Sequence, residues 1–229
     1  MIDRLLRLIS PHICCCCGEV GAILCPNCKN DITEEAYSAC IGCLAPAALS
    51  NLCGSCRRKA AYDEAWVVGE RTGPLKRLID AYKFERAYEG AEVLVDLLDA
   101  RLPIWPEGGC VTYIPDIASH RRQRGSDHMA IVARGLARRR MMAYDRLLER
   151  RTSLSQRGST QADRLVRQRG AFAARNVPDD TPIVLIDDIY TTGATIAAAV
   201  AALREATMAP IYIVCLARQP FADHRKARL

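Results

Sequence analysis

The chain has 229 residues, of which 50% are hydrophobic, and a formal net charge of +6 at pH 7. A membrane span needs about 20 consecutive apolar residues, and no run in this sequence approaches that length, so we expect a soluble, cytoplasmic protein. The length suits one α/β domain of ordinary size preceded by a small accessory domain. We place the boundary near Arg57-Arg58-Lys59, which divides the chain into residues 1–58 and 59–229.

The chain contains 12 cysteines, and eight of them form four Cys-x-x-Cys pairs within residues 1–58. The pairs are Cys14/Cys17, Cys25/Cys28, Cys40/Cys43 and Cys53/Cys56. Two such pairs supply four thiolates to one tetrahedral Zn²⁺ ion, so the pattern predicts two structural zinc ions. Joining the first pair to the second and the third to the fourth closes the shortest loops and is preferred, while a crossed arrangement stays open.

Other uses of these cysteines compete with zinc. A disulfide framework requires an oxidising compartment, but the charged stretch 2–9 predicts a short amphipathic helix rather than a signal peptide. A redox site of the thioredoxin kind uses one such pair rather than four, whereas an iron–sulfur cluster stays open. Cys15 and Cys16 either replace a ligand or stay free. Cys110 and Cys215 lie in apolar runs and are expected to be buried.

Beyond residue 58, strand and helix patterns alternate. The expected order is a strand at 62–69, helices at 72–82 and 88–101, a strand at 110–114, a helix at 126–142, and strands at 182–187 and 210–217 around a helix at 196–206. This alternation predicts an α/β fold with a mostly parallel sheet and flanking helices. The stretch 151–160 has no periodicity and is predicted to be a mobile loop.

The stretch 183–195 carries the most informative motif of the chain. Its four apolar residues, 183–186, predict a buried parallel strand, and Asp187 and Asp188 stand at the carboxyl end of that strand. A loop of Thr191, Thr192, Gly193, Ala194 and Thr195 follows and leads into the helix. Ligands of open α/β sheets bind at this edge, where the N–H groups of a helix N-terminus face an anion.

The residue types in the motif suit a sugar phosphate. Gly193 lets the backbone approach a phosphate closely, and the threonine hydroxyls donate hydrogen bonds to its oxygens. Asp187 and Asp188 can accept hydrogen bonds from neighbouring sugar hydroxyls, with Mg²⁺ nearby. The alternative is that the two acids cap the next helix and the loop is an ordinary turn. The ordered string as a whole favours a ribose 5-phosphate.

This motif resembles the phosphoribosyl diphosphate (PRPP) loop of type I phosphoribosyltransferases, and other segments narrow the resemblance to the ComF-type competence proteins. The further matches are the cysteine pairs, Gly73-Pro74-Leu75-Lys76 with Lys83-Phe84, Tyr113-Ile114-Pro115, Arg121-Arg122-Gln123-Arg124-Gly125, Arg151-Thr152 with Gln156, and Arg169-Gly170-Ala171-Phe172. The resemblance implies a type I phosphoribosyltransferase-like α/β fold behind a double zinc-ribbon domain. It also implies PRPP binding with Mg²⁺ and a role in DNA uptake during natural transformation.

The resemblance assigns roles to individual residues. Asp187 and Asp188 are the expected catalytic pair, and residues 191–195 are expected to bind the 5-phosphate. The candidates for the pyrophosphate are Pro115, Asp116, Arg121, Arg122, Arg124 and Lys83, and those for a closing loop are Arg151, Thr152 and Gln156. The chain departs from the family pattern at residues 126–128, where Ser-Asp-His replaces Phe-Asn-Gln, and after Pro115, where Asp116-Ile117 replaces a second proline.

Positive charge is concentrated in residues 119–175, which contain fifteen arginines and four acidic residues. This segment is either a solvated basic face or a phosphate-binding surface. The cluster Arg138-Arg139-Arg140 lies at a helix end, far in sequence from the PRPP motif, and favours nucleic acid or a partner protein.

Three functions stay open from the sequence. The first is an enzyme that transfers phosphoribose to an unknown acceptor, and the second is a non-catalytic sensor that retains a PRPP site. The third is a zinc-ribbon adaptor of the DNA-uptake machinery that binds single-stranded DNA or protein. The expected partners are therefore PRPP or a related phosphosugar, single-stranded DNA, and a competence helicase or another DNA-uptake protein.

Overall fold

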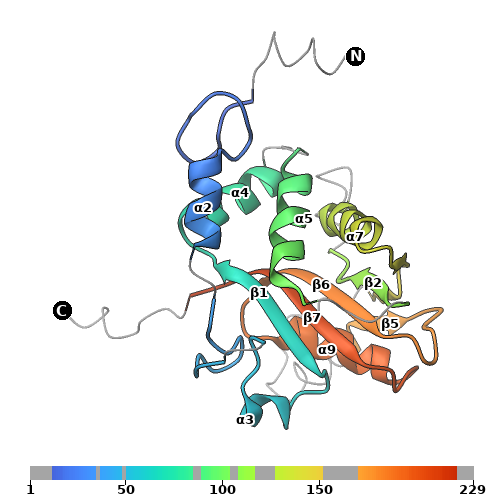
Figure 1. Ribbon diagram of the computed structural model, residues 1–229. Coiled ribbons are helices and arrows are strands. Elements are labelled where there is room, and N and C mark those ends of the chain that lie inside the picture. The colour runs from blue at the N-terminus through green and yellow to red at the C-terminus, as the bar shows by residue number, and fades with distance from the viewer. Residues whose placement is uncertain are drawn as a thin grey trace, which may run out of the picture.

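The structure is a computed structural model that describes residues 12–34, 37–47, 50–84, 89–103, 108–116, 127–151 and 170–220. A parallel sheet of five strands, in the order β1-β7-β6-β2-β3, forms its centre (Figure 1). The strands are β1 (Glu64–Glu70), β2 (Cys110–Tyr113), β3 (Ala143–Tyr144), β6 (Ile183–Tyr190) and β7 (Ile211–Arg218). The predicted α/β fold class with a mostly parallel sheet is confirmed.

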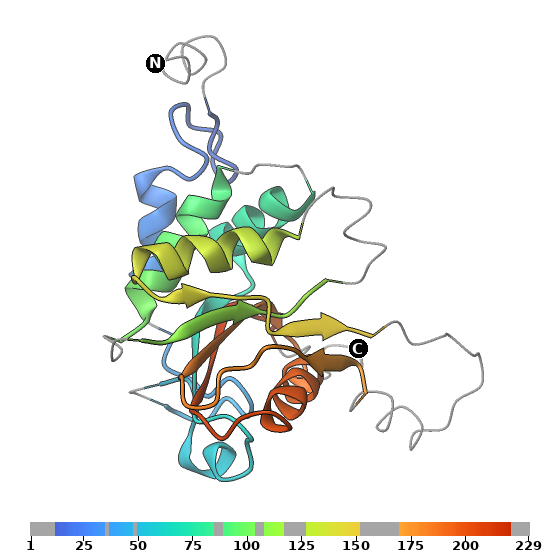
Figure 2. The same cartoon turned by 90° about the vertical axis from the view of Figure 1, so that its right-hand side faces the viewer.

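Helices cover both faces of the sheet (Figure 2). One face carries α4 (Gly73–Phe84), α5 (Gly90–Arg101) and α7 (His128–Arg139), whose buried side chains recur at three- and four-residue spacing. The other face carries α9 (Ala194–Arg204) and a separate antiparallel pair, β4 (Leu148–Arg150) and β5 (Phe172–Ala174). The sheet therefore separates two hydrophobic clusters, as is usual for a doubly covered parallel sheet.

The cysteine-rich segment divides between these two faces. Cys14, Cys25 and Cys28, the last of which lies in α2 (Pro26–Thr33), pack into the cluster that contains α4 and α5. Cys40 packs into the cluster that contains α9, and the short helix α3 (Gly54–Arg57) lies on that side (Figure 1). Residues 12–58 thus cross from one layer of the molecule to the other.

The observed elements differ from the expected ones at several ends. Strand β6 continues to Tyr190, beyond the predicted end at residue 187, because residues 187–190 still pair with β7. The short elements α2, α3, β3, β4 and β5 were not predicted. The helix expected at 2–9 lies outside the described residues, as does the stretch 152–160 of the expected mobile loop. In the described part of the chain, every helix is too short or too polar to cross a bilayer.

Candidate functional site

Two neighbouring strands bring the predicted site residues to one edge of the sheet. Because β2 pairs with β6, and the Ile114 N–H donates to the Ile186 carbonyl at 3.0 Å, the segment after β2 ends beside the acids of β6. A hollow of about 150 Å³ opens there. It is lined by Ile114, Pro115, Asp116, Met129, Arg150, Asp187, Asp188, Ile189 and Thr195. At this edge, Asp116, which follows β2, therefore lies close to Asp187 and Asp188 of the neighbouring strand β6.

Lys83, in the last turn of α4, contacts one of the acids that line this hollow. Its ammonium group forms an ion pair with the Asp188 carboxylate, and the two side chains are only 12% and 20% exposed. A pair this well shielded is screened less by salt than a surface pair. The structure thus places a predicted pyrophosphate candidate in direct contact with one of the two predicted catalytic acids.

Asp187 is a carboxyl group whose ionisation the fold opposes. Burial raises the pKa of Asp187 well above its usual range, and the neighbouring charge of Asp188 raises it further. The Asp188 N–H, which donates to Asp187 Oδ1 at 2.9 Å, acts in the opposite direction, as do Lys83 and Arg150. A carboxyl in this state is stabilised by a ligand that brings positive charge or hydroxyl donors to it. Sugar hydroxyls with Mg²⁺ meet both requirements.

Arg150 is a site residue that the sequence analysis did not single out. It lies at the end of β4, where its guanidinium packs over the Phe172 ring at 4.7 Å and its Nε donates to the Pro115 carbonyl at 3.0 Å. Burial lowers the pKa of Arg150, although nearby Asp116 and Asp187 raise it. Its position in the arginine-rich segment 119–175 was the only signal, because a strand of three residues leaves no periodicity to detect.

The expected phosphate loop lies next to the acids. Gly193 adopts a left-handed conformation (φ 77°) immediately before α9, whose first helical hydrogen bond joins the Ala197 N–H to the Gly193 carbonyl at 2.8 Å. The N–H groups before that bond belong to the open N-terminal turn, which is where anions bind. Thr191, Thr192 and Thr195 are exposed, and Thr195 also lines the hollow with the acids. Acids and loop therefore share one site.

Part of the expected pyrophosphate subsite lies outside the described residues. This applies to Arg121, Arg122 and Arg124, and to the loop candidates Thr152 and Gln156. The described neighbours of the basic segment are informative, because Asp116 before it and Met129 after it both line the hollow. Arg151 is exposed, and its N–H donates to the Ala171 carbonyl at 2.9 Å.

The departure from the family pattern at residues 126–128 falls at the start of α7. Asp127 is the N-cap residue of that helix. His128 is 1% exposed and packs edge-on against Tyr82 of α4, at 5.1 Å between ring centroids. The Tyr82 hydroxyl also donates to the His128 carbonyl at 2.8 Å. The histidine therefore ties α7 to the helix that carries Lys83.

The eight paired cysteines form two groups, and within each group the four Sγ atoms all lie within 4.8 Å of one another. The first cluster contains Cys14, Cys17, Cys25 and Cys28, and the second contains Cys40, Cys43, Cys53 and Cys56. Zinc–sulfur bonds of about 2.3 Å in a tetrahedron place sulfurs about 3.8 Å apart. The Sγ–Sγ distances of 3.6 Å (Cys17–Cys25) and 3.5 Å (Cys43–Cys53) agree with this spacing. The sequential pairing is confirmed, and the thiols fit two structural zinc ions.

Each cluster contains a thiol that ionises readily. Burial opposes ionisation of Cys14, but backbone hydrogen bonds inside the first cluster outweigh it and lower its pKa to about 6. In the second cluster, the Ser55 hydroxyl and the backbone lower the pKa of Cys53 to about 6. Cys16 stands outside both clusters, and burial beside Cys15 raises its pKa to about 12. Metal binding needs thiolates, and Cys14 and Cys53 supply one readily ionised thiol to each cluster. Burial raises the pKa of Cys28 and of Cys56, so geometry rather than pKa separates the clustered thiols from Cys16.

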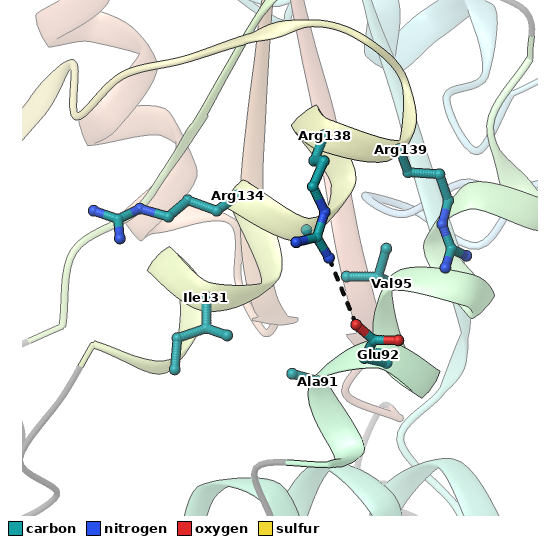
Figure 3. A pocket seen from close by; sticks show the side chains of 8 residues that line it. Ala91, Glu92, Val95, Ile131, Arg134, Arg138 and Arg139 are labelled. Atoms are coloured by element: carbon teal, nitrogen blue, oxygen red, sulfur yellow. Dashed lines mark ion pairs between the residues drawn. The ribbon is translucent and has the colours of Figure 1, made fainter. Parts of the chain in front are cut away.

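The predicted basic cluster at the end of α7 is largely neutralised by acids of α5. Arg139 pairs with Asp96 and Arg140 pairs with Asp99, whereas Arg138 lies 3.6 Å from Glu92. Figure 3 shows this last pair across a hollow of about 460 Å³ between the two helices. Arg139 and Arg140 therefore tie α7 to α5, whereas the pair of Arg138 is exposed and weak.

Comparison with known proteins adds a relative. No family model matches the chain. The competence protein ComFC of Streptococcus pneumoniae (strain ATCC BAA-255 / R6) is 27% identical over 197 residues, which cover 84% of this chain and 81% of the relative. The chain is thus similar to a competence protein over most of its length, and its two four-cysteine clusters fit the zinc-ribbon domain expected from the sequence.

Proposed function

We propose that the hollow at the carboxyl edge of the sheet binds PRPP together with Mg²⁺, and that this binding serves DNA uptake in competence. The observation that carries the proposal is the placement of Asp187, Asp188 and Thr195 on one hollow, next to the loop 191–195. The loop and the α9 N-terminus would bind the 5-phosphate, and the acid pair would accept hydrogen bonds from the ribose hydroxyls.

Cationic groups at the hollow suit the pyrophosphate. Arg150 lines the hollow, and Lys83 contacts Asp188 from α4. Asp116 and Met129 line the same hollow, and the sequence between them contains Arg121, Arg122 and Arg124. Guanidinium groups bind phosphate oxygens in a bidentate manner, and bound Mg²⁺ would offset the charge of the pyrophosphate. Asp116, Asp187 and Asp188 are the carboxylates near enough to hold that ion.

If phosphoribose is transferred, the chain needs no nucleophile of its own. Its cationic side chains would stabilise charge on the departing pyrophosphate, while the acid pair and the phosphate loop hold the ribose for attack by an acceptor. Binding without turnover is the second candidate. It is favoured by the start of α7, where His128 is buried in helix packing and the apolar Met129 faces the hollow.

Calorimetric titration of PRPP with Mg²⁺ tests the proposal, with ribose 5-phosphate as the comparison ligand. The double change Asp187→Asn with Asp188→Asn should abolish binding, whereas Asp180→Asn, at an exposed acid outside the hollow, should not change it. PRPP binding much tighter than that of ribose 5-phosphate would support a pyrophosphate subsite and justify a search for the acceptor. Equal binding of both would support a sensor, and no binding of either would refute the proposal in favour of the zinc-ribbon adaptor.

A further inference from the structure

Tyr190 lies between the phosphate loop and the second cysteine cluster, which are far apart in the sequence. It is the last residue of β6, immediately before the phosphate loop, and its side chain is 8% exposed. A Cβ atom placed on Gly193 would lie 2.3 Å from the Tyr190 hydroxyl oxygen and 2.7 Å from its Cζ. The ring therefore packs directly against the glycine that opens α9.

The same hydroxyl group also faces the second cysteine cluster. Gly42 lies between the ligands Cys40 and Cys43, and a Cβ atom on it would lie 3.9 Å from the Tyr190 hydroxyl and 3.4 Å from the Cys56 sulfur. Burial raises the pKa of Tyr190, and the neighbouring thiols, including Cys40 and Cys56, contribute to the increase. The side chain thus stands between the second cluster and the phosphate loop.

The second cluster is itself anchored to the strand that pairs with β6. Arg218, at the end of β7 and 1% exposed, donates from Nε to the Ile41 carbonyl at 2.8 Å. Beside Tyr190 lies a hollow of about 380 Å³, which is lined by Tyr62, Thr192 and Gly193 among others. Tyr190 is buried despite this space, because its ring packs against Gly193 and its hydroxyl lies near Gly42 of the second cluster.

We propose that the metal-bound second cluster positions the phosphate loop through Tyr190, so that loss of this metal weakens 5-phosphate binding. Tyr190 is then a positioning residue that touches no ligand. The ligand part of this inference rests on the proposed function, but the coupling of cluster to loop does not. A loop that is already ordered binds its ligand without a further loss of conformational entropy, whereas an unsupported loop loses that entropy on binding and so binds more weakly.

The first cluster provides a matched control inside the same chain. It packs on the opposite face of the sheet, in the hydrophobic cluster of α4 and α5. Cys16, which follows Cys14 in the chain but is not a member of the cluster, reaches the start of α4, where its Sγ lies 3.5 Å from the Pro74 carbonyl. Loss of the metal of the first cluster should therefore disturb α2 and α4 while the loop 191–196 keeps its support.

Hydrogen–deuterium exchange of the ligand-free protein tests the coupling. Changing Cys40 and Cys56 to serine should reduce the zinc content by one ion per chain and speed exchange at residues 191–196 by about tenfold. The equivalent double change at Cys14 and Cys28 should remove one ion without that effect. Equal exchange at residues 191–196 in the two variants would overturn the proposal, because neither metal would then act on the loop specifically.

A second pair of variants leaves the metal ligands intact. Tyr190→Leu should keep both zinc ions, speed exchange at residues 191–196 and weaken PRPP binding about three- to tenfold. Tyr62→Leu, which alters a neighbouring tyrosine in the same hollow, should also keep both zinc ions but should leave both the exchange rate and PRPP binding unchanged. Unchanged exchange in Tyr190→Leu would refute the coupling even if PRPP binds. Faster exchange in a protein that never binds PRPP would refute only the proposed function.

Discussion

Replacing Gly193 by alanine should destabilise the protein more than the same change at Gly108. Both glycines have positive φ, 77° and 93°, which costs an alanine about 1–2 kcal/mol. At Gly108 a Cβ atom would meet nothing within 4 Å, whereas at Gly193 it would lie 2.3 Å from the Tyr190 hydroxyl. Overpacking of this kind costs about 1–3 kcal/mol, so Gly193→Ala should lose about 2–5 kcal/mol in total.

Urea-induced unfolding followed by circular dichroism measures both variants on one scale. The informative quantity is the difference between their free energies of unfolding, about 1–3 kcal/mol, because the cost of positive φ is common to both. Adding Tyr190→Leu to Gly193→Ala should recover part of the loss, since the two side chains share one contact. Equal losses at Gly193 and Gly108 would refute the argument, because the ring would then not restrict the glycine.

Three further changes test other contacts. Asp187→Asn should raise the free energy of unfolding at neutral pH by about 0.5–2 kcal/mol and abolish the part of its pH dependence that Asp187 causes. The raised pKa of Asp187 means that the folded state binds the proton more tightly than the unfolded state. The free energy of unfolding of the wild type should therefore fall as the pH rises from the pKa of Asp187 in the unfolded state towards its pKa in the folded state. Urea titration at several pH values measures this change. Gly135→Ala would place a Cβ atom 2.7 Å from Val95 Cγ2, which costs about 1–3 kcal/mol. Because alanine gains about 0.5–1 kcal/mol over glycine inside a helix, the net loss in the same assay should be up to about 2.5 kcal/mol. Arg218→Met should cost about 1–3 kcal/mol by leaving the Ile41 carbonyl without its buried donor, with a lower thermal midpoint.

The motif around β6 could be predicted because its signals are local. A buried apolar strand, two acids, a threonine-rich turn and a helix follow one another within about a dozen residues, and each has its own residue preference. The cysteine pairs were equally clear, and the shortest-loop argument gave the observed grouping. Even here the end of β6 was placed too early, because pairing of Asp187 and Tyr190 with the long strand β7 is a tertiary effect.

The rest of the site depends on contacts that no local pattern records. Arg150 enters the hollow from a strand of three residues, and Lys83 pairs with Asp188 from the end of a helix more than 100 positions away. The charge of Arg138 to Arg140 gave the opposite impression, because their acidic partners lie on a different helix. Charge counted along a sequence shows how many cations a segment has, but pairing decides how many remain available.

The boundary expected at residues 57–59 stays a prediction, but hydrogen bonds cross it. Sequence composition changes there, but the backbone of the cysteine segment continues onto the exposed side of the edge strand β1. The Asn51 N–H donates to the Ala65 carbonyl at 2.7 Å, and the Val67 N–H donates to Asn51 Oδ1 at 2.8 Å. Unpaired groups on an edge strand invite association with other chains. The ligands Cys43 and Cys53 of the second cluster precede and follow Asn51 in the chain, so the bound metal should hold Asn51 in place. Removal of that metal should therefore expose the free edge of β1 as well as release the phosphate loop. The second part of the cysteine segment is therefore hydrogen-bonded to the sheet's edge strand, so we expect its folding and that of the sheet to be coupled.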